Sequence, residues 1–175
     1  MIVWIDGANG VGKSHVAAEL AELLADKNAE YVESDLCWYD ALKHFPQMFL
    51  LGLNPCQNLY MIAKLRESLE EKIQDPDKFL FVSMTLADKK CNDGLLNYFA
   101  GKGIPTLHII LMAKRENLIS RIENDPIRDA SMQKQQKDNL DWHLAFLENN
   151  YPDAIRINTD DKSLDEVVGE IKAML

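Results

Sequence analysis

The sequence has few cysteines and no long apolar run. Cys37, Cys56 and Cys91 are widely spaced and form no C-x-x-C or cysteine–histidine cluster, so free thiols are expected rather than disulfides or a zinc site. The N-terminus lacks the basic segment and apolar core of a signal peptide. The longest apolar-leaning run, residues 45–53, is too short to span a bilayer. We therefore expect a cytoplasmic protein without a membrane span.

Positive charge is also scarce. Lysine and arginine number 19 against 28 aspartates and glutamates, which gives a net charge of −9 at pH 7. A nucleic-acid surface needs a basic face, so we expect no nucleic-acid partner. Repeats, low-complexity tracts and linkers are absent, and 175 residues suit one well-packed unit. The prediction is a single domain over residues 1–175, as a monomer or homodimer.

Short apolar runs alternate with segments of helical spacing. The apolar runs predict strands over 2–5, 31–33, 79–83, 106–111 and 154–157. Helices are predicted over 14–27, 36–44, 56–74, 88–100, 115–124 and 131–149, with a last one capped by Ser163 and Glu166. This alternation predicts an α/β fold, with a five-stranded parallel sheet between two helical layers.

The stretch after the first strand reads Asp-Gly-Ala-Asn-Gly-Val-Gly-Lys-Ser and matches the phosphate-binding pattern G-x4-G-K-[S/T] in its strand–loop–helix context. Glycines let the backbone curl and turn its amides toward an anion, and the helix N-terminus adds positive potential. Lys13 can bridge the outer phosphates, and the Ser14 hydroxyl can bind Mg²⁺. The alternative is a glycine-rich turn that matches by chance. The predicted ATP-binding residues here are Gly7, Asn9, Gly10, Val11, Gly12, Lys13, Ser14 and His15.

Other parts of the chain separate the classes of P-loop protein. A GTPase needs a late Asn-Lys-x-Asp, and the nearest run, residues 158–161, has no lysine in the required place. Many P-loop proteins carry an acidic residue at the end of the third strand, where this chain has Ser83 followed by Met84 and Thr85. The missing carboxylate weakens an ATPase interpretation. A short chain with an early phosphate loop favours a kinase of a small molecule.

Asp35 is the strongest catalytic candidate outside the loop. It follows the second predicted strand, whose carboxyl end faces the crevice where open parallel sheets bind ligands. A kinase acting on a hydroxyl uses a carboxylate there to accept the proton. Glu33 points to the same side and could bind Mg²⁺ through water or steady Asp35. The structural alternative is that Asp35 only caps the next helix.

Arginines follow the fourth predicted strand, where such a kinase carries a lid, here residues 124–137. Arg121 can stack on adenine or reach a phosphate, and Arg128 can neutralise the transferring phosphoryl group. Arg115 is a further candidate for this role. Lys114, Lys134 and Lys137 fit a solvated helix face better.

The acceptor site is expected within residues 35–66, between the second and third strands. Trp38, Tyr39 and Arg66 are its candidate ligands, together with Asp35. The segment is poor in cations, which favours a neutral or partly apolar acceptor over a highly phosphorylated one. Packing between helices is the alternative role for the aromatic residues. His143 carries no clear signal at this stage.

Two stretches together resemble the tunicamycin-resistance ATP-binding proteins. The first runs from Met1 through Lys13 and Ser14, and the second is Val82-Ser83-Met84-Thr85-Leu86, followed by residues 107–111 and the helix with Arg121. The likeness covers residues 1 to about 125. It implies a fold like that of nucleoside-monophosphate kinases and antibiotic phosphotransferases, with ATP on residues 7–14 and modification or sequestration of a nucleoside antibiotic.

Two hypotheses follow. The first is an ATP- and Mg²⁺-dependent kinase of a small-molecule hydroxyl, with Lys13, Asp35 and Arg128 as its catalytic residues. The second is a nucleotide-dependent binding protein that sequesters a ligand or acts as a switch without phosphoryl transfer.

Overall fold

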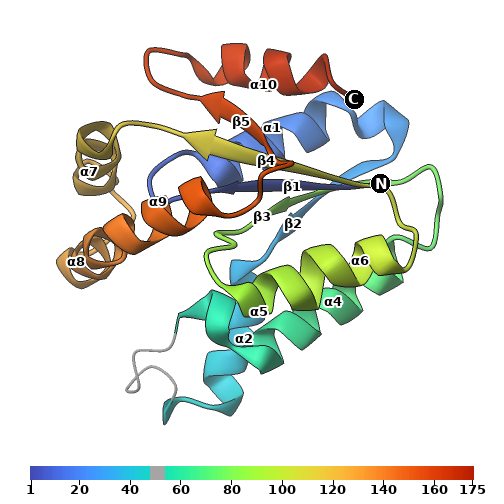
Figure 1. Cartoon of the computed structure of the whole chain (residues 1–175), viewed down its shortest axis with the longest axis horizontal. Coiled ribbons are helices and arrows are strands. Elements are labelled where there is room, and N and C mark those ends of the chain that lie inside the picture. The colour runs from blue at the N-terminus through green and yellow to red at the C-terminus, as the bar shows by residue number, and fades with distance from the viewer. Residues whose placement is uncertain (48–53) are drawn as a thin grey trace.

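The computed structural model describes residues 1–47 and 54–175, so residues 48–53 of the predicted acceptor segment lie outside the described part. Its centre is a parallel sheet in the order β2-β3-β1-β4-β5 (Figure 1). The strands are β1 (Ile2–Gly7), β2 (Ala29–Glu33), β3 (Phe79–Ser83), β4 (Thr106–Met112) and β5 (Ile155–Asn158). The predicted five-stranded parallel sheet is confirmed.

The central strand β1 explains the two cores. Its residues are fully buried, and successive side chains point to opposite faces of the sheet. Val3 and Ile5 pack with α1 (Lys13–Leu23) and α10 (Leu164–Lys172). Ile2 and Trp4 pack with α4 (Leu59–Lys72) and with the helical stretch formed by α5 (Lys89–Cys91), a π-helical turn (Asn92–Leu96) and α6 (Asn97–Gly101). The result is the predicted three-layer α/β/α arrangement.

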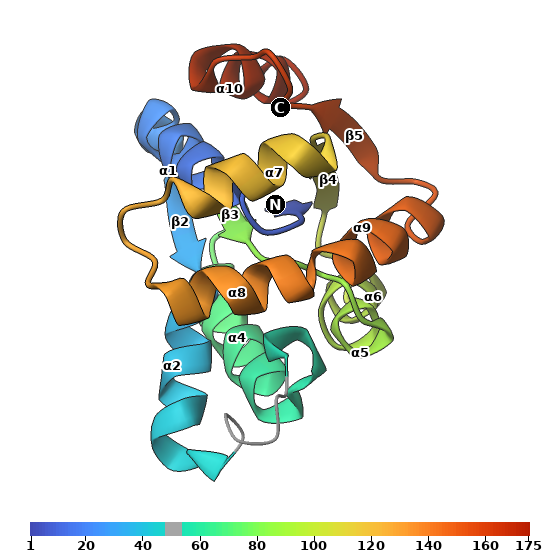
Figure 2. The same ribbon diagram turned by 90° about the vertical axis from the view of Figure 1, so that its left-hand side faces the viewer.

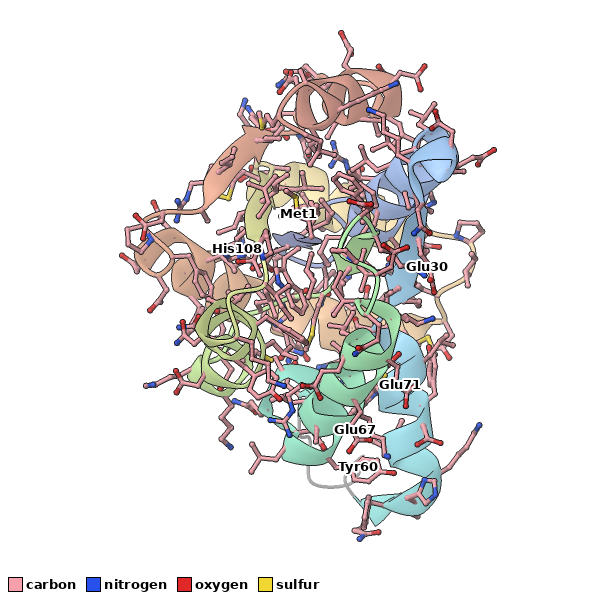
Figure 3. The ribbon with its side chains drawn as sticks, turned by 90° about the vertical axis from the view of Figure 1, so that its right-hand side faces the viewer. Met1, Glu30, Tyr60, Glu67, Glu71 and His108 are labelled. Carbon is pink, nitrogen blue, oxygen red and sulfur yellow. The ribbon has the colours of Figure 1, made fainter. Side chains whose placement is uncertain are left out.

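The remaining helices cluster near the carboxyl ends of the strands. They are α2 (Asp35–His44), α7 (Arg115–Glu123), α8 (Ala130–Asp138) and α9 (Leu140–Asn149); short 3₁₀ turns occupy Ala25–Lys27 and Pro55–Gln57. Figure 2 looks onto this edge, with α7 and α8 above α2 and α4. Figure 3 shows the opposite side, where Glu30 of β2 binds Lys72 and Lys78.

Two local predictions are wrong. The single helix predicted over 131–149 is divided at Asn139, because α8 buries none of its residues whereas α9 buries Leu140 and Leu147. Asp35 does not cap α2; it is the first helical residue, and Ser34 occupies the cap position. The Ser34 hydroxyl makes no cap bond, since it donates to the Ser83 carbonyl at 2.6 Å. The predicted capping box of Ser163 and Glu166 is confirmed.

Within residues 1–47 and 54–175, no helix combines the length and apolar character that a membrane crossing requires.

Candidate active site

The phosphate loop joins β1 to α1 and is held from below by a buried carboxylate. Asp6 is fully buried, and its Oδ1 accepts the backbone N–H groups of Gly7 at 2.6 Å and Leu86 at 2.9 Å. Its Oδ2 lies 2.9 Å from His108 Nε2. The Thr85 hydroxyl donates to the Gly7 carbonyl at 2.9 Å. The segment that follows β3 and a histidine of β4 therefore fix the start of the loop.

The loop itself has the backbone that the motif requires. Gly10 and Gly12 have positive φ, a conformation that residues with a Cβ rarely adopt. Gly12 also occupies the cap position of α1 and provides no side-chain bond, so the first-turn amides of this helix are open to an anion. Lys13 folds back, with Nζ donating to the Ala8 carbonyl at 3.1 Å. Burial lowers the pKa of Lys13 to about 8, although the negative charges of Asp6 and Asp35 act to raise it.

A cavity of about 1060 Å³ opens beside this loop. That volume is at the upper end for ligand sites, large enough for a nucleotide with a second small molecule. Most of the predicted site residues line it: Asn9, Gly10, Val11, Gly12, Lys13, Ser14, His15, Asp35, Trp38, Tyr39, Arg121 and Arg128. Gly7 lies behind the loop, where its role is the turn rather than contact with the cavity.

Oxygen-bearing side chains meet where β2 and β3 end. Glu33 and Ser83 are paired neighbours in the parallel register. The Tyr31 hydroxyl donates to the Glu33 carboxylate and lies 2.9 Å from Ser83 Oγ, which is 3.4 Å from Ser14 Oγ. Burial and Glu33 together raise the pKa of Tyr31 to about 12, so this phenol stays protonated at neutral pH.

This oxygen set fits Mg²⁺ in its usual setting. Mg²⁺ prefers oxygen donors and takes one or two carboxylates or hydroxyls, with water and substrate phosphates completing its shell. Ser14 and Ser83 offer hydroxyls and Glu33 a carboxylate next to the loop. The described residues hold no cluster of three or more histidine, cysteine or acidic side chains that could form a protein-only metal cage.

Asp35 faces the same cavity from the first turn of α2. Desolvation and the neighbouring Glu33 raise the pKa of Asp35, while Lys13 and Arg128 oppose that rise. Lys13, Asp35 and Arg128, the three predicted catalytic residues, line the same cavity, and the charges of Lys13 and Arg128 both act on Asp35. A raised pKa brings a carboxylate closer to the range in which it accepts a proton well.

The arginines beyond β4 have different partners. The Arg121 guanidinium forks onto Thr159 after β5, with 3.1 Å to its hydroxyl and 3.0 Å to its carbonyl. Arg128 pairs through Nε with Asp125 at 2.7 Å and also donates to Gln136. Arg115 bonds Asp141 on the surface, outside the cavity lining.

Arg66 was predicted to bind the acceptor, but the structure places it outside the cavity. Its guanidinium lies 4.6 Å from the ring centre of Tyr98 on the far side of α4. Two of the lysines that were expected on a solvated helix face pair with acidic residues outside the cavity. Lys134 pairs with Asp138, and Lys137 pairs with Glu123.

Sequence reasoning missed a polar pair in the cavity wall. His143 of α9 is 2% exposed, and its Nε2 lies 3.4 Å from Nδ2 of Asn54. Burial and the nearby Lys13 lower the pKa of His143 to about 4. Leu140, His143 and Leu147 follow helical spacing, so a histidine on the buried face of α9 was the signal available in the sequence.

Comparisons with known structures bear on the fold. A tunicamycin resistance protein from Deinococcus radiodurans superposes with a TM-score of 0.73 at 21% identity, over 99% of this chain and 94% of that one. A gluconokinase from Sinorhizobium meliloti 1021 gives 0.67 at 19% identity, over 98% and 89%. A sugar kinase from Janibacter sp. HTCC2649 gives 0.66 at 18%, over 98% and 92%. No protein-family model and no curated protein matches the sequence. The chain thus has the fold of the P-loop kinases, and the resemblance to the tunicamycin-resistance proteins is confirmed at the level of fold.

Proposed function

We propose that the protein is a kinase that transfers the terminal phosphoryl group of ATP to a hydroxyl of a small molecule. The observation that carries this proposal is the meeting of a phosphate loop, two cationic side chains and the Asp35 carboxylate at one cavity. An ATP hydrolase needs a group that activates water, whereas a kinase needs a carboxylate facing an acceptor hydroxyl.

ATP is proposed to lie with its triphosphate on residues 7–15. The loop amides and the N-terminus of α1 would hold the phosphates, and Lys13 would neutralise charge on the outer ones. Arg121 and Thr159 line the cavity on the other side of the loop, where the adenosine would lie. This is the end of the cavity that is packed against α7 and α10.

Mg²⁺ is proposed to bind at Ser14, with Glu33 and Ser83 contacting its water shell. When bound, the ion would neutralise charge between the two outer phosphates of ATP. The chain's own part is to orient these oxygens: the Tyr31 hydroxyl fixes the Glu33 carboxylate and also contacts Ser83.

Asp35 is proposed as the general base. The acceptor hydroxyl would approach it from the segment 35–66, against Trp38 and Tyr39, and would lose its proton to the carboxylate as the phosphoryl group transfers. Residues 124–137 are proposed as the lid, in which Arg128 would leave Asp125 and turn toward the transferring group. The name of the Deinococcus neighbour suggests a nucleoside-type antibiotic as one acceptor class, beside a metabolite hydroxyl.

The substitution Asp35→Asn tests this assignment, with Asp40→Asn on the same helix as the matched control, since Asp40 pairs with His44 outside the cavity. Wild type and variants are incubated with ATP, Mg²⁺ and a panel of nucleosides, sugars and aminoglycosides, and products are read by mass. Asp35→Asn should lower turnover by about 10²–10⁴-fold, with ATP affinity nearly unchanged. Unaltered turnover would remove Asp35 from the mechanism.

One observation keeps a second function in view. The end of β3 carries the hydroxyl of Ser83 where a carboxylate would assist metal-dependent transfer. A protein that binds ATP to sequester a ligand or to switch a partner has no need of that carboxylate. The same panel decides between the two: a phosphorylated product supports the kinase, and its absence with ATP still bound supports the binding protein.

A further inference from the structure

The cavity is divided by charge. Its cationic side chains come from the phosphate loop, from α7, from the segment before α8 and from the turn before α10: Lys13, Arg121, Arg128 and Lys162. Each already has a partner: Ala8, Thr159, Asp125 and Glu170 in turn. All four partners offset the charge, Ala8 and Thr159 through a carbonyl dipole and Asp125 and Glu170 through a carboxylate. Lys13 also lies under the proposed phosphates.

The opposite wall is uncharged. We define the acceptor wall as the cavity-lining residues Trp38, Asn54, Met61, Met84 and His143. Met61 and Met84 belong to the core cluster of α4 and β3, and Trp38 packs against the same cluster. The charged groups that act on His143 are Lys13, which lies under the proposed phosphates, and the buried Asp6.

Within the acceptor wall, Asn54 and His143 provide the polar atoms. The Asn54 Oδ1 accepts from the Cys56 backbone N–H at 3.3 Å and from its thiol at 3.2 Å, which fixes the amide so that Nδ2 faces His143. If Nδ2 donates to Nε2, the ring proton is on Nδ1, a buried atom without a hydrogen-bond partner. The second N–H of the Asn54 amide is then available to an oxygen in the cavity.

His143 cannot add a positive charge near neutral pH. Burial lowers its pKa to about 4, and Lys13 acts in the same direction. An anionic acceptor placed here would therefore find no cation in the acceptor wall itself, and Lys13, the cation that acts on His143, is engaged by the proposed phosphates. Arg66, the cation that could have served an anion, is stacked on Tyr98 outside the cavity.

From this arrangement we infer that Asn54 and His143 form an uncharged hydroxyl-binding pair that selects uncharged, polyhydroxylated acceptors and rejects anionic ones. The inference rests on the proposed function for the position of ATP. Asn54 binds an acceptor hydroxyl oxygen, and His143 holds the amide in place. Trp38 and, to a smaller extent, Met84 supply the apolar surface for the C–H face of a sugar ring, as in a furanose or a pyranose. Asp35 then meets a second hydroxyl of the same ring.

Binding is measured apart from transfer, so that the two proposals can fail separately. Isothermal titration is run with the protein saturated by Mg²⁺ and a non-hydrolysable ATP analogue. Matched probes are glucose, glucuronate and glucosamine, and uridine with its 5′-monophosphate. At least one uncharged probe should bind about tenfold or more tightly than its anionic partner. Equal or tighter binding of the anion, preference for the amine, or no binding by any uncharged probe would overturn the inference.

Variants assign the selectivity to the pair. Asn54→Leu should lower the affinity for the uncharged probe about tenfold. Its affinity for the ATP analogue should equal that of wild type, which also shows that the fold is kept. Asn149→Leu, on the exposed end of α9, is the matched control and should bind both as wild type. Asn54→Lys should shift the preference toward the anionic probe, a change that a merely structural residue would not cause. Unchanged probe affinity in Asn54→Leu would contradict the inference, whereas probe binding without phosphoryl transfer would contradict only the kinase.

Discussion

Gly10 and Gly12 have similar backbones but very different surroundings, and this difference gives a quantitative test of how the loop is built. Their φ angles are 81° and 100°. A Cβ on Gly12 would meet nothing within 4 Å. A Cβ on Gly10 would lie 2.9 Å from the Leu118 carbonyl oxygen and 2.9 Å from Cγ1 of Ile122, both on α7. Alanine at Gly12 is therefore strained only by its own backbone, whereas alanine at Gly10 must also displace α7.

The two terms can be put into numbers. A left-handed backbone costs a residue with a Cβ about 1–2 kcal/mol, which is the whole expected loss for Gly12→Ala. Overpacking adds about 1–3 kcal/mol, so Gly10→Ala should lose about 2–5 kcal/mol in total. In a domain of this length 1 kcal/mol lowers Tm by about 2–4 °C. Gly10→Ala should therefore melt about 2–12 °C below Gly12→Ala.

Calorimetry on both variants without nucleotide measures this difference, and ATP titration gives the second half of the test. Gly12→Ala, although the more stable variant, places a methyl group beside the first amides of α1 and should lose ATP affinity out of proportion to its stability. Equal melting temperatures, or the reverse order, would refute the packing of the loop against α7. ATP affinity that falls only in step with stability would refute the role of Gly12 in anion binding.

Three other predictions concern single side chains. Because the unfolded chain binds a proton at His143 near its ordinary pKa of 6.5 and the folded protein only near 4, stability should fall as pH drops from about 6.5 toward 4; between pH 7.5 and 5 the loss is about 2 kcal/mol. Urea unfolding should show this loss of stability in wild type and not in His143→Leu. An equal loss in both proteins would contradict the assignment to His143. The pKa of Lys13 is about 8 without ligand, and phosphate should restore it, so ATP binding at pH 9 should take up about one proton. Calorimetry in two buffers of different ionisation enthalpy measures this, and uptake that persists in Lys13→Arg would exclude Lys13 as its source. Arg66→Ala should cost about 0.5–1 kcal/mol of stability through Tyr98 and leave the acceptor KM unchanged; a raised KM would return Arg66 to the site.

The sequence was sufficient where one local pattern decides the structure. The run Ile2–Ile5 is apolar at every position because both faces of the central strand are covered, and the glycine spacing of residues 7–12 is a backbone requirement. The capping box at Ser163 is equally local. Such features follow from the chemistry of neighbouring residues, so they could be placed without the rest of the chain.

Contacts between distant segments could not be placed in this way. Asn54 and His143 are 89 residues apart, and only the tertiary fold brings α9 beside the residue that precedes the Pro55–Gln57 turn. Arg66 lies in the predicted acceptor segment, but its turn of α4 faces Tyr98 of α6 instead of the cavity. Helical periodicity gives the face of one helix relative to its own axis, and tertiary packing decides which face meets the site.

The same reasoning applies to the acidic group that β3 lacks. In a parallel sheet, residues at one register position on neighbouring strands lie side by side. A carboxylate on β2 can therefore lie near the same oxygen atoms as a carboxylate at the end of β3 would. Glu33 is the register partner of Ser83, and the Tyr31 hydroxyl joins the two. Ser83 in turn lies 3.4 Å from the Ser14 hydroxyl of the loop. The absence of an acidic residue at the end of β3 therefore argues against phosphoryl transfer only if β3 is considered alone. In the sheet, the Glu33 carboxylate on the neighbouring strand β2 lies beside that position. Removing it with Glu33→Gln should weaken the Mg²⁺ dependence of ATP binding while Ser83→Ala does so less, and equal effects would mean that Glu33 does not take this place.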